Sequence, residues 1–329
     1  MKIIGFGAAL VDKQFVVKDK FLTEQGLKKG FMTLTQEETQ ENLLAKLKEE
    51  NYEEFSSCGG SATNSIYAAA ALGTNSGFIG KVGNDKDGEL YQTDLKDNSI
   101  DISNCITSES GKTGNCIVLI SPDAERTMNS FLGVSSETNF LEINTDFISS
   151  SNVIFIEAYA VTSPDTKNAV EKLIELSLES NMKIALSLSD PNIVEGFKLE
   201  IKSWMKEKID YLFCNFDEAK AFCESENFSY LEEFAKTIFV TNGSKATFVI
   251  QNNKSIQVPA FQAEAKDTNG AGDMFAGGVL YGLSLEWEPE VAASFGNFLA
   301  SKGVSMLGPR LKKHQYKEFL EYFLENIKN

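Results

Sequence analysis

The chain has 329 residues, of which 42% are hydrophobic, and its formal net charge is −16. This length fits one large α/β domain or two ordinary ones. The acidic balance argues against nucleic acid or an anionic membrane as the main partner, because binding a phosphate-rich surface requires a cationic field. Arg126 and Arg310 are the two arginines and His314 is the one histidine, which argues against a histidine base or a histidine metal cluster.

The five cysteines are scattered along the chain and include no C-x-x-C pair. This pattern predicts reduced thiols in a cytoplasmic protein rather than disulfides or a zinc site. The N-terminal stretch MKIIGFGAALVD is too short and too interrupted by glycine for a signal peptide. Because the sequence has no run of about 18 apolar residues, we expect no membrane-spanning helix.

Short apolar runs alternate with helical patterns along most of the chain. The runs that predict strands cover residues 2–7, 76–82, 115–120, 152–157, 183–188, 210–215, 237–242, 246–251 and 255–260. The patterns that predict helices lie near residues 36–50, 61–72, 86–98, 164–180, 216–224, 270–283, 288–303 and 312–328. This alternation is typical of an α/β fold with a central, mostly parallel sheet flanked by helices on both faces. Because no repeat or proline-rich linker divides the chain, residues 1–329 are expected to form a single domain.

Two segments, residues 10–34 and 105–135, do not fit this alternation. Both contain hairpin-like strand patterns that project from the predicted central sheet. If they pair, they form a small β-sheet over a pocket, and such a lid excludes water from transfer chemistry. The alternative is that they are ordinary edge strands.

The N-terminal GFGAAL begins like a dinucleotide-binding fingerprint, but Leu10 replaces the third glycine and a strand pattern follows in place of a helix. A tight turn leading to Asp12 fits better. Asp12 is then either a surface carboxylate or an acceptor for ligand hydroxyls. The stretch NSGFIGKVG has Gly80 and Lys81 but lacks the first glycine and the Ser or Thr of a Walker A loop, so if the protein binds ATP it does so in another way.

A glycine-rich stretch, SSCGGSATNS, opens the helix predicted over residues 61–72, which Gly73 ends. The alanines of this helix predict burial and nothing more. Its polar entry differs, because Gly60 lets a ligand approach the backbone and the Asn64 side chain both donates and accepts hydrogen bonds. The stretch predicts either a buried helix alone or a site for a sugar diol.

A second glycine-rich stretch, KDTNGAGDMFAGG, covers residues 266–278 and opens a helix with glycines, which are poor helix formers. A helix N-terminus has free N–H groups and a partial positive charge, and small residues there let an anion reach those groups. Gly270, Ala271 and Gly272 can therefore form an anion cradle. Asp273 is either an N-terminal cap or a general base beside that cradle. The later glycines predict close packing of the helix against a neighbour.

These stretches resemble the two signature regions of the ribokinase-like (PfkB) carbohydrate kinases. GGSATNS resembles the first region and DTNGAGDMFAGG the second, in the order that the family has them. Between them, IGKVGNDKDGE, DAERTMNSFLG, NFDEA and VTNGSKA resemble further family segments, so the resemblance covers essentially the whole chain. It implies a ribokinase-like fold and a kinase that transfers the γ-phosphoryl group of ATP to a primary alcohol.

The resemblance also implies roles for individual residues. By this resemblance Asp273 is the base, and the anion hole is formed by Gly270, Ala271 and Gly272. The substrate is held by Asp12, Gly60, Ser61, Asn64 and Arg126, and ATP is contacted by Thr241, Gly243 and Asn297. Mg²⁺ is organised through water by Asn215 and Glu218, and Asp267 is a ligand position for a monovalent cation such as K⁺. Asn269 departs from the threonine that some members have beside that cation. The chemistry agrees, because phosphoryl transfer mainly requires positioning and neutralisation of charge.

The acceptor is less well defined by the sequence. The long segment between Asp12 and Gly60 contains DKFLTEQGLKKG, which resembles the adenosine kinase-like members, as does ALSLSDPNIV further along. This favours adenosine, phosphorylated on its 5′-OH, with ribose, fructose or a related sugar as the alternative. A catalytically silent nucleoside- or sugar-binding protein and a Rossmann oxidoreductase are the other possibilities. A lid sheet is compatible with a monomer or with a homodimer formed through the lid.

Overall fold

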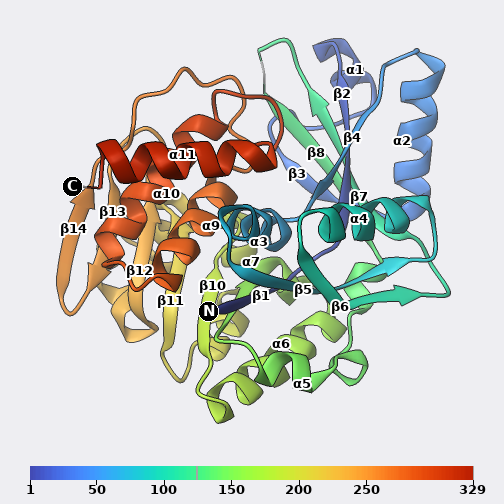
Figure 1. Ribbon diagram of the computed structural model, residues 1–329. Helices are drawn as coiled ribbons and strands as arrows, with labels where there is room; N and C mark the ends of the chain where they lie inside the picture. Colours follow the sequence, from blue (N-terminus) through green and yellow to red (C-terminus); the bar gives the residue numbers. More distant parts are fainter. Residues whose placement is uncertain (124, 329) are drawn as a thin grey trace.

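The computed structural model describes residues 1–123 and 125–328 (Figure 1). Within these residues a nine-stranded sheet has the order β14-β13-β12-β11-β10-β9-β1-β5-β6. Its parallel strands are β1 (Lys2–Phe6), β5 (Asn75–Gly83), β6 (Ile100–Ser108), β9 (Val153–Glu157), β10 (Lys183–Ser187), β11 (Ile209–Asn215) and β12 (Ala235–Thr241), and the antiparallel edge is β13 (Thr247–Gln251) and β14 (Lys254–Val258). Every residue of β9, VIFIE, is buried, as expected for a strand covered on both faces.

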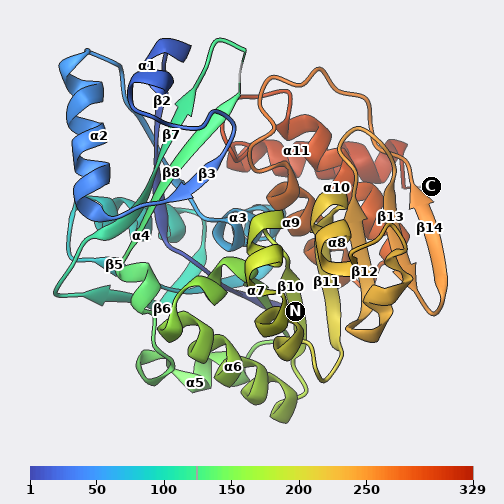
Figure 2. The ribbon, with the colours of Figure 1, turned by 180° about the vertical axis from the view of Figure 1, so that it is seen from behind.

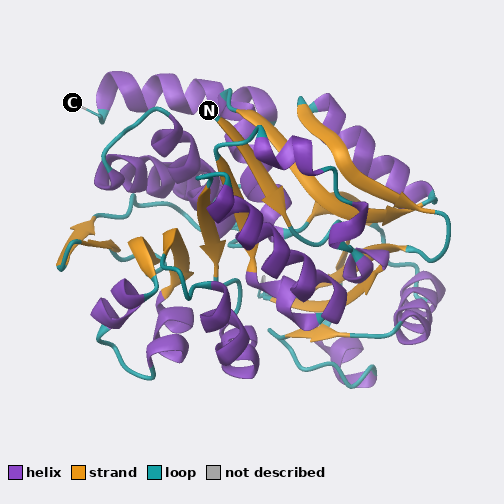
Figure 3. Cartoon of the chain, turned by 90° about the horizontal axis from the view of Figure 1, so that it is seen from below, coloured by secondary structure: helices purple, strands orange, loops and turns teal. Residues whose placement is uncertain are grey.

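Helices cover both faces of this sheet (Figures 2 and 3). One face packs against α3 (Ser61–Leu72), α4 (Lys86–Asp97), α9 (Ala271–Ser284), α10 (Pro289–Gly303) and α11 (Lys313–Asn326). The other face packs against α5 (Thr145–Ser149), α6 (Pro164–Glu179), α7 (Pro191–Trp204) and α8 (Phe216–Cys223). Short 3₁₀ turns occur at Val134–Glu137, Phe140–Glu142, Ala158–Thr162 and Phe228–Glu233. None of the helices in the described ranges is long and apolar enough to cross a membrane.

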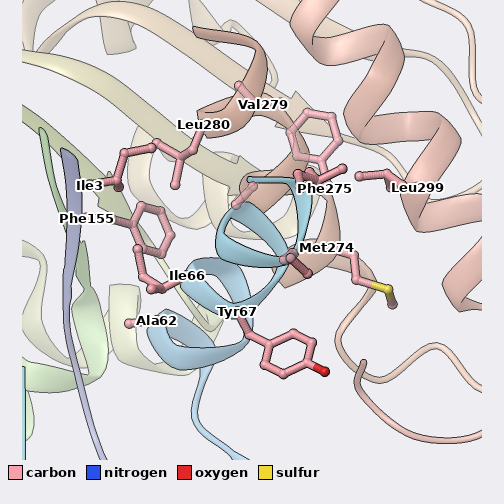
Figure 4. Close-up of a cluster of buried hydrophobic side chains, with 14 of the residues drawn as sticks. Ile3, Ala62, Ile66, Tyr67, Phe155, Met274, Phe275, Val279, Leu280 and Leu299 are labelled. Atoms are coloured by element: carbon pink, nitrogen blue, oxygen red, sulfur yellow. The ribbon is translucent and has the colours of Figure 1, made fainter. Parts of the chain in front are cut away.

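The contact between α3 and α9 positions the candidate site. Figure 4 shows Ile66 and Tyr67 of α3 in one apolar cluster with Met274 and Phe275 of α9. Gly277 lies at the point of closest approach, where a Cβ would stand 2.5 Å from the Ala68 Cβ and the Ser65 carbonyl oxygen. The close packing predicted from the later glycines is therefore present, and it brings the first turns of the two helices together.

A second sheet lies beside the first and has the strand order β3-β8-β7-β2-β4 within the described residues. Its strands are β2 (Leu10–Val16), β3 (Met32–Leu34), β4 (Phe55–Gly59), β7 (Thr113–Ile120) and β8 (Arg126–Gly133). The short helix α1 (Asp19–Glu24) and the longer α2 (Glu37–Glu49) share a small apolar core with this sheet. Figure 1 shows this unit, with α1 and α2, at one end of the molecule.

The predicted fold class is confirmed, including the additional small sheet. Several details differ from the sequence-based expectation, and the short helices α1 and α5 have no counterpart among the predicted helices. Residues 105–108 belong to β6 of the large sheet rather than to the small one, β4 has no counterpart among the predicted strands, and α7 has none among the predicted helices. β4 has the sequence FSSCG, in which Phe55 is the one residue of the branched or aromatic kind that marks a strand. Pairing with β2 on the small sheet makes it a strand.

Candidate active site

Asp273 lies in the first turn of α9 and points toward the first turn of α3. Its carboxylate accepts hydrogen bonds from Ser61 Oγ at 2.7 Å and from Asn64 Nδ2 at 2.8 Å. The N-cap residue of α9 is Gly270, which has no side chain to cap the helix. Asp273 is therefore not the N-cap of α9, and its carboxylate is oriented by a neighbouring helix. Its role as a general base stays a prediction.

Burial determines the acid–base properties of Asp273. Desolvation raises the pKa of its carboxyl above the ordinary value of 3.8, whereas the hydrogen bonds from Ser61 and Asn64 and the positive charge of Arg310 lower it. A carboxylate whose pKa is raised by burial accepts a proton more readily than one in water. Asp273 is therefore a buried carboxyl whose orientation and pKa are set by named neighbours.

The residues of the predicted anion cradle, Gly270, Ala271 and Gly272, lie at the start of α9 directly before Asp273. Gly270 has a left-handed backbone, with φ of 73°, and a Cβ there would overlap the Pro309 carbonyl oxygen. At Gly272 a Cβ would meet no atom within 4 Å, and this residue lines a cavity of about 90 Å³ beside Asp273. The first N–H groups of a helix have no acceptor within it and can bind an anion. Here the Ala271 N–H donates to the Thr268 carbonyl at 3.3 Å, so an anion would compete with that contact.

Asp12 approaches the same region from the small sheet. It lies on β2, is 8% exposed, and packs against Gly59. Burial raises the pKa of Asp12 to about 7, partly offset by the charges of Arg310 and Arg126. Gly60 follows with a φ of 93°, and a Cβ there would overlap the Ala8 carbonyl oxygen, so this position requires glycine.

Asn215, Glu218 and Thr241 line the 90 Å³ cavity opposite Asp273. Asn215 and Thr241 are paired at the carboxyl ends of the parallel strands β11 and β12, which is where ligands bind in open α/β sheets. Asn215 and Glu218 form a capping box at the start of α8, with Glu218 accepting from the Asn215 backbone N–H at 2.9 Å and from its Nδ2 at 2.6 Å. Burial raises the pKa of Glu218 to about 7.

Arg126 connects the small sheet to the segment before α9. Its Nη2 forms an ion pair with Asp267 Oδ2, and the Asp267 side chain is only 1% exposed. Asp267 also accepts from the Asn269 backbone N–H at 3.0 Å and from the Gly308 backbone N–H at 2.7 Å. Both carboxylate oxygens of Asp267 are thus engaged by protein groups.

The two remaining ATP-contact predictions lie away from the residues around Asp273. Gly243 has a φ of 54°, and a Cβ there would meet nothing within 4 Å, so its surroundings are open. Asn297 is buried and accepts from Thr247 Oγ1 at 2.7 Å, while its Nδ2 donates to the Val258 and Pro259 carbonyls at 3.2 and 3.1 Å. The Asn297 amide is therefore committed to joining α10 to the edge strands. Its contact with ATP stays a prediction.

Sequence reasoning missed two charged residues of this region. Glu157 ends β9 and accepts from the backbone N–H groups of Ala8 and Ala62, each at 2.7 Å, so it ties the end of β1 to the start of α3. Its position at the carboxyl end of an apolar run was the available signal. Arg310 donates to Asn64 and to Asp94, and nothing local in the sequence links these three positions.

Three buried carboxyls make the stability of the ligand-free protein depend on pH in an unusual direction. Burial raises the pKa of Asp12, Glu157 and Glu218 to about 7 each, from ordinary values of 3.8 for Asp and 4.5 for Glu. Between these values the folded state keeps protons that the unfolded state has lost, so the free energy of unfolding falls as pH rises through this window. We expect the thermal midpoint to decrease from pH 5 to pH 7 and to level off above it.

The measurement is a thermal melt of the ligand-free protein across pH 5 to 8, with Glu218→Gln as the comparison. Removing one titrating group should flatten part of the slope. Carboxyls whose pKa is lowered, such as Asp85, act below this window. A midpoint that rises between pH 5 and pH 7 contradicts the expectation.

Comparison with known proteins now adds to this geometry. The sequence profile of the pfkB family carbohydrate kinases matches residues 31–314. The chain belongs to this family. As a pfkB kinase it is an ATP-dependent enzyme with an alcohol group as its acceptor.

The pfkB relatives include nucleoside and sugar kinases. The chain is 26% identical over 331 residues to adenosine kinase of Saccharomyces cerevisiae, covering 93% of this chain and 96% of that one. The solved adenosine kinase of Sinorhizobium meliloti is 27% identical with a TM-score of 0.88, and 98% of each chain is covered. A probable sugar kinase of Rhizobium etli matches with a TM-score of 0.89 at 24% identity, again over 98% of each chain, which shows the fold alone.

Proposed function

We propose that this pfkB kinase transfers the γ-phosphoryl group of ATP to the 5′-OH of a nucleoside, with adenosine as the first candidate. The observation that carries the proposal is a cavity of about 620 Å³ between the small sheet and the segment before α11. A volume of this size is in the range of pockets that enclose drug-sized ligands. It is larger than a pentose alone requires.

One wall of this cavity is apolar. It includes Val16 and Phe55 of the small sheet, which are 62% and 53% exposed, and Leu307, which is 78% exposed, lines the cavity from the segment before α11. Exposed apolar side chains gathered at one place are typical of a binding surface. A flat purine ring fits such a wall, because aromatic rings bury a large apolar area and stack on one another.

The other end of the cavity is polar and leads to Asp273. Arg310 lines this end and donates from Nε to Asn64 Oδ1 at 2.7 Å. Asn64 in turn donates to Asp273. A nucleoside with its purine ring on the apolar wall and its ribose toward Arg310 has its 5′-OH directed at the carboxylate of Asp273.

The residues then divide the chemistry between them. Asp273 takes the proton of the acceptor hydroxyl as that oxygen attacks the γ-phosphorus, and the bond from the γ-phosphorus to the β–γ bridging oxygen breaks, which releases ADP. The N–H groups at Gly270, Ala271 and Gly272 receive the negative charge that develops on the transferred group. The small sheet carries Asp12 against the acceptor and excludes water from it.

Mg²⁺ fits the Asn215–Glu218 pair through water. No cluster of three or more His, Cys, Asp or Glu residues in the described ranges could hold a metal ion directly, which suits an ion that arrives bound to ATP phosphates and keeps several waters. Glu218 is a buried carboxyl with a pKa of about 7 beside the cavity. When bound, Mg²⁺ neutralises phosphate charge, and Glu218 holds its hydration shell.

A monovalent cation at Asp267 does not fit the arrangement in this structure. The guanidinium of Arg126 is already the counter-charge of the carboxylate; Oδ2 also accepts from the Gly308 N–H, and Oδ1 accepts from the Asn269 N–H. A cation would be repelled by Arg126, whose charge already neutralises the carboxylate. We therefore assign no step to K⁺.

The test is an acceptor panel with ATP and Mg²⁺: adenosine, inosine, ribose and fructose. We expect the highest kcat/KM for adenosine. A preference for ribose or fructose establishes the sugar kinase alternative, and absence of ATP consumption with all four acceptors contradicts the proposed function.

A variant of the apolar wall sharpens this test. Phe55→Ser should raise KM for adenosine by about tenfold, because the partial loss of an aromatic contact is worth roughly 1.4 kcal/mol. It should leave KM for ribose unchanged. Leu141→Ser is the matched control, since Leu141 is 91% exposed and does not line the cavity.

A further inference from the structure

Arg310 is the most extensively held cation in the region of the site. It lies between α10 and α11, and its side chain is only 10% exposed. Its Nε donates to Asn64 Oδ1 at 2.7 Å, its Nη1 donates to Asp94 Oδ2 at 2.6 Å, and its guanidinium lies 4.6 Å from the centroid of the Tyr67 ring. Three contacts from two helices, α3 and α4, fix the plane of this group.

The contact with Asn64 decides which way the Asn64 amide faces. A guanidinium can only donate hydrogen bonds, so the amide oxygen must face Arg310. The amide nitrogen then faces Asp273, to which it donates at 2.8 Å. In the flipped amide, donor would meet donor at Arg310 and oxygen would meet carboxylate at Asp273, which loses both hydrogen bonds.

We propose that Arg310 is a positioning residue for phosphoryl transfer, which orients the carboxylate of Asp273 through the amide of Asn64. The proposal rests on the proposed role of Asp273 as the base. Asp94 and Tyr67 hold Arg310, Arg310 holds Asn64, and Asn64 holds Asp273. Ser61 donates to the second carboxylate oxygen of Asp273. Each of the two oxygens is therefore oriented by one hydrogen bond.

Charge supports the same role. The titratable groups that face Asp273 come from several elements and are Asp12 of β2, Glu157 of β9, Tyr159, Glu218 of α8, Arg310 and Tyr316 of α11. The carboxylates among them oppose ionisation of Asp273. Arg310 favours it and lowers the pKa of the base.

The experiment measures kcat, KM and the pH profile for Arg310→Met and Arg310→Lys, with adenosine as acceptor, or with the sugar if the acceptor panel shows a preference for it. In Arg310→Met, kcat should fall roughly 10- to 100-fold, because a base displaced by about 1 Å loses that much rate. KM for ATP should stay unchanged, and the acid limb of the kcat profile should move to higher pH. Arg310→Lys keeps the charge but not the fork of donors, so its acid limb should match wild type and its kcat should be intermediate.

Lys13→Met is the matched control. Lys13 also forms an ion pair with α4, to Asp87 at 2.7 Å, and it stands next to Asp12 in the sequence, yet this pair does not involve Asn64. Its kcat and pH profile should equal those of wild type. If Arg310→Met loses thermal stability because Asp94 is left unpaired, the double variant with Asp94→Asn removes the stranded charge.

The possible outcomes distinguish the positioning role of Arg310 from the role of Asp273 as the base. If Asp273→Asn is impaired while Arg310→Met keeps kcat within about twofold of wild type and an unmoved acid limb, the positioning role is wrong and the base stands. If Asp273→Asn itself is active, the role of Asp273 is wrong whatever Arg310 does. A fall in thermal midpoint with kcat per folded enzyme unchanged shows a merely structural arginine and also overturns the positioning role.

Discussion

Replacing Asp273 with asparagine should lower kcat by roughly 10²-fold or more, the scale at which a general base contributes. The substitution keeps the shape of the side chain. The new amide oxygen can accept from Asn64 Nδ2, and the new amide nitrogen can donate to Ser61 Oγ, so both hydrogen bonds persist. Because burial opposes the charged form of Asp273, removing the charge should leave the thermal midpoint unchanged or higher.

The measurement is single-turnover phosphoryl transfer at saturating ATP and acceptor, together with a thermal melt. Asp217→Asn is the matched control, because Asp217 lies in the first turn of α8, as Asp273 lies in the first turn of α9, but is exposed. Its rate should equal that of wild type. A near-wild-type rate for Asp273→Asn would contradict the assignment of Asp273 as the base.

The central sheet and the helix pair at the site follow from local sequence signals. The helix predicted over residues 61–72 is α3 itself, because glycines flank it and its body is small and apolar. The turn at Gly270 and the position of Asp273 in the first turn of α9 also follow from local rules on glycine and helix starts. Such signals depend on a few adjacent residues, which is why a single sequence contains them.

The parts that sequence reasoning missed depend on contacts between distant residues. The strand β4 exists because β2 pairs with it, and its own sequence favours a turn. The hydrogen bonds of Arg310 join residues that are 246 and 216 positions apart in the chain. The ion pair of Arg126 with Asp267 spans 141 positions and gives Asp267 a counter-charge that its local sequence does not indicate. No local pattern contains such a pairing.

The glycines at positions 270 and 272 look equivalent in the sequence, but the structure separates their roles. Gly272→Ala should lower the rate of phosphoryl transfer by roughly 10²-fold, the scale of one lost oxyanion contact. The added methyl meets no protein atom within 4 Å and lines the cavity beside Asp273, so it occupies the space in which an anion approaches the N–H groups. The thermal midpoint should not fall, since alanine favours a helix over glycine by up to about 1 kcal/mol.

Two further substitutions make this prediction sharp. Gly196→Ala places the same methyl in α7, on an exposed face with nothing within 4 Å, and should leave the rate unchanged. Gly270→Ala should instead lower the thermal midpoint, because its φ of 73° is costly for alanine and its Cβ would overlap the Pro309 carbonyl oxygen. If Gly272→Ala transfers phosphate at the wild-type rate, the cavity beside Asp273 does not hold the transferred group. In that case the anion must bind at another part of the helix start.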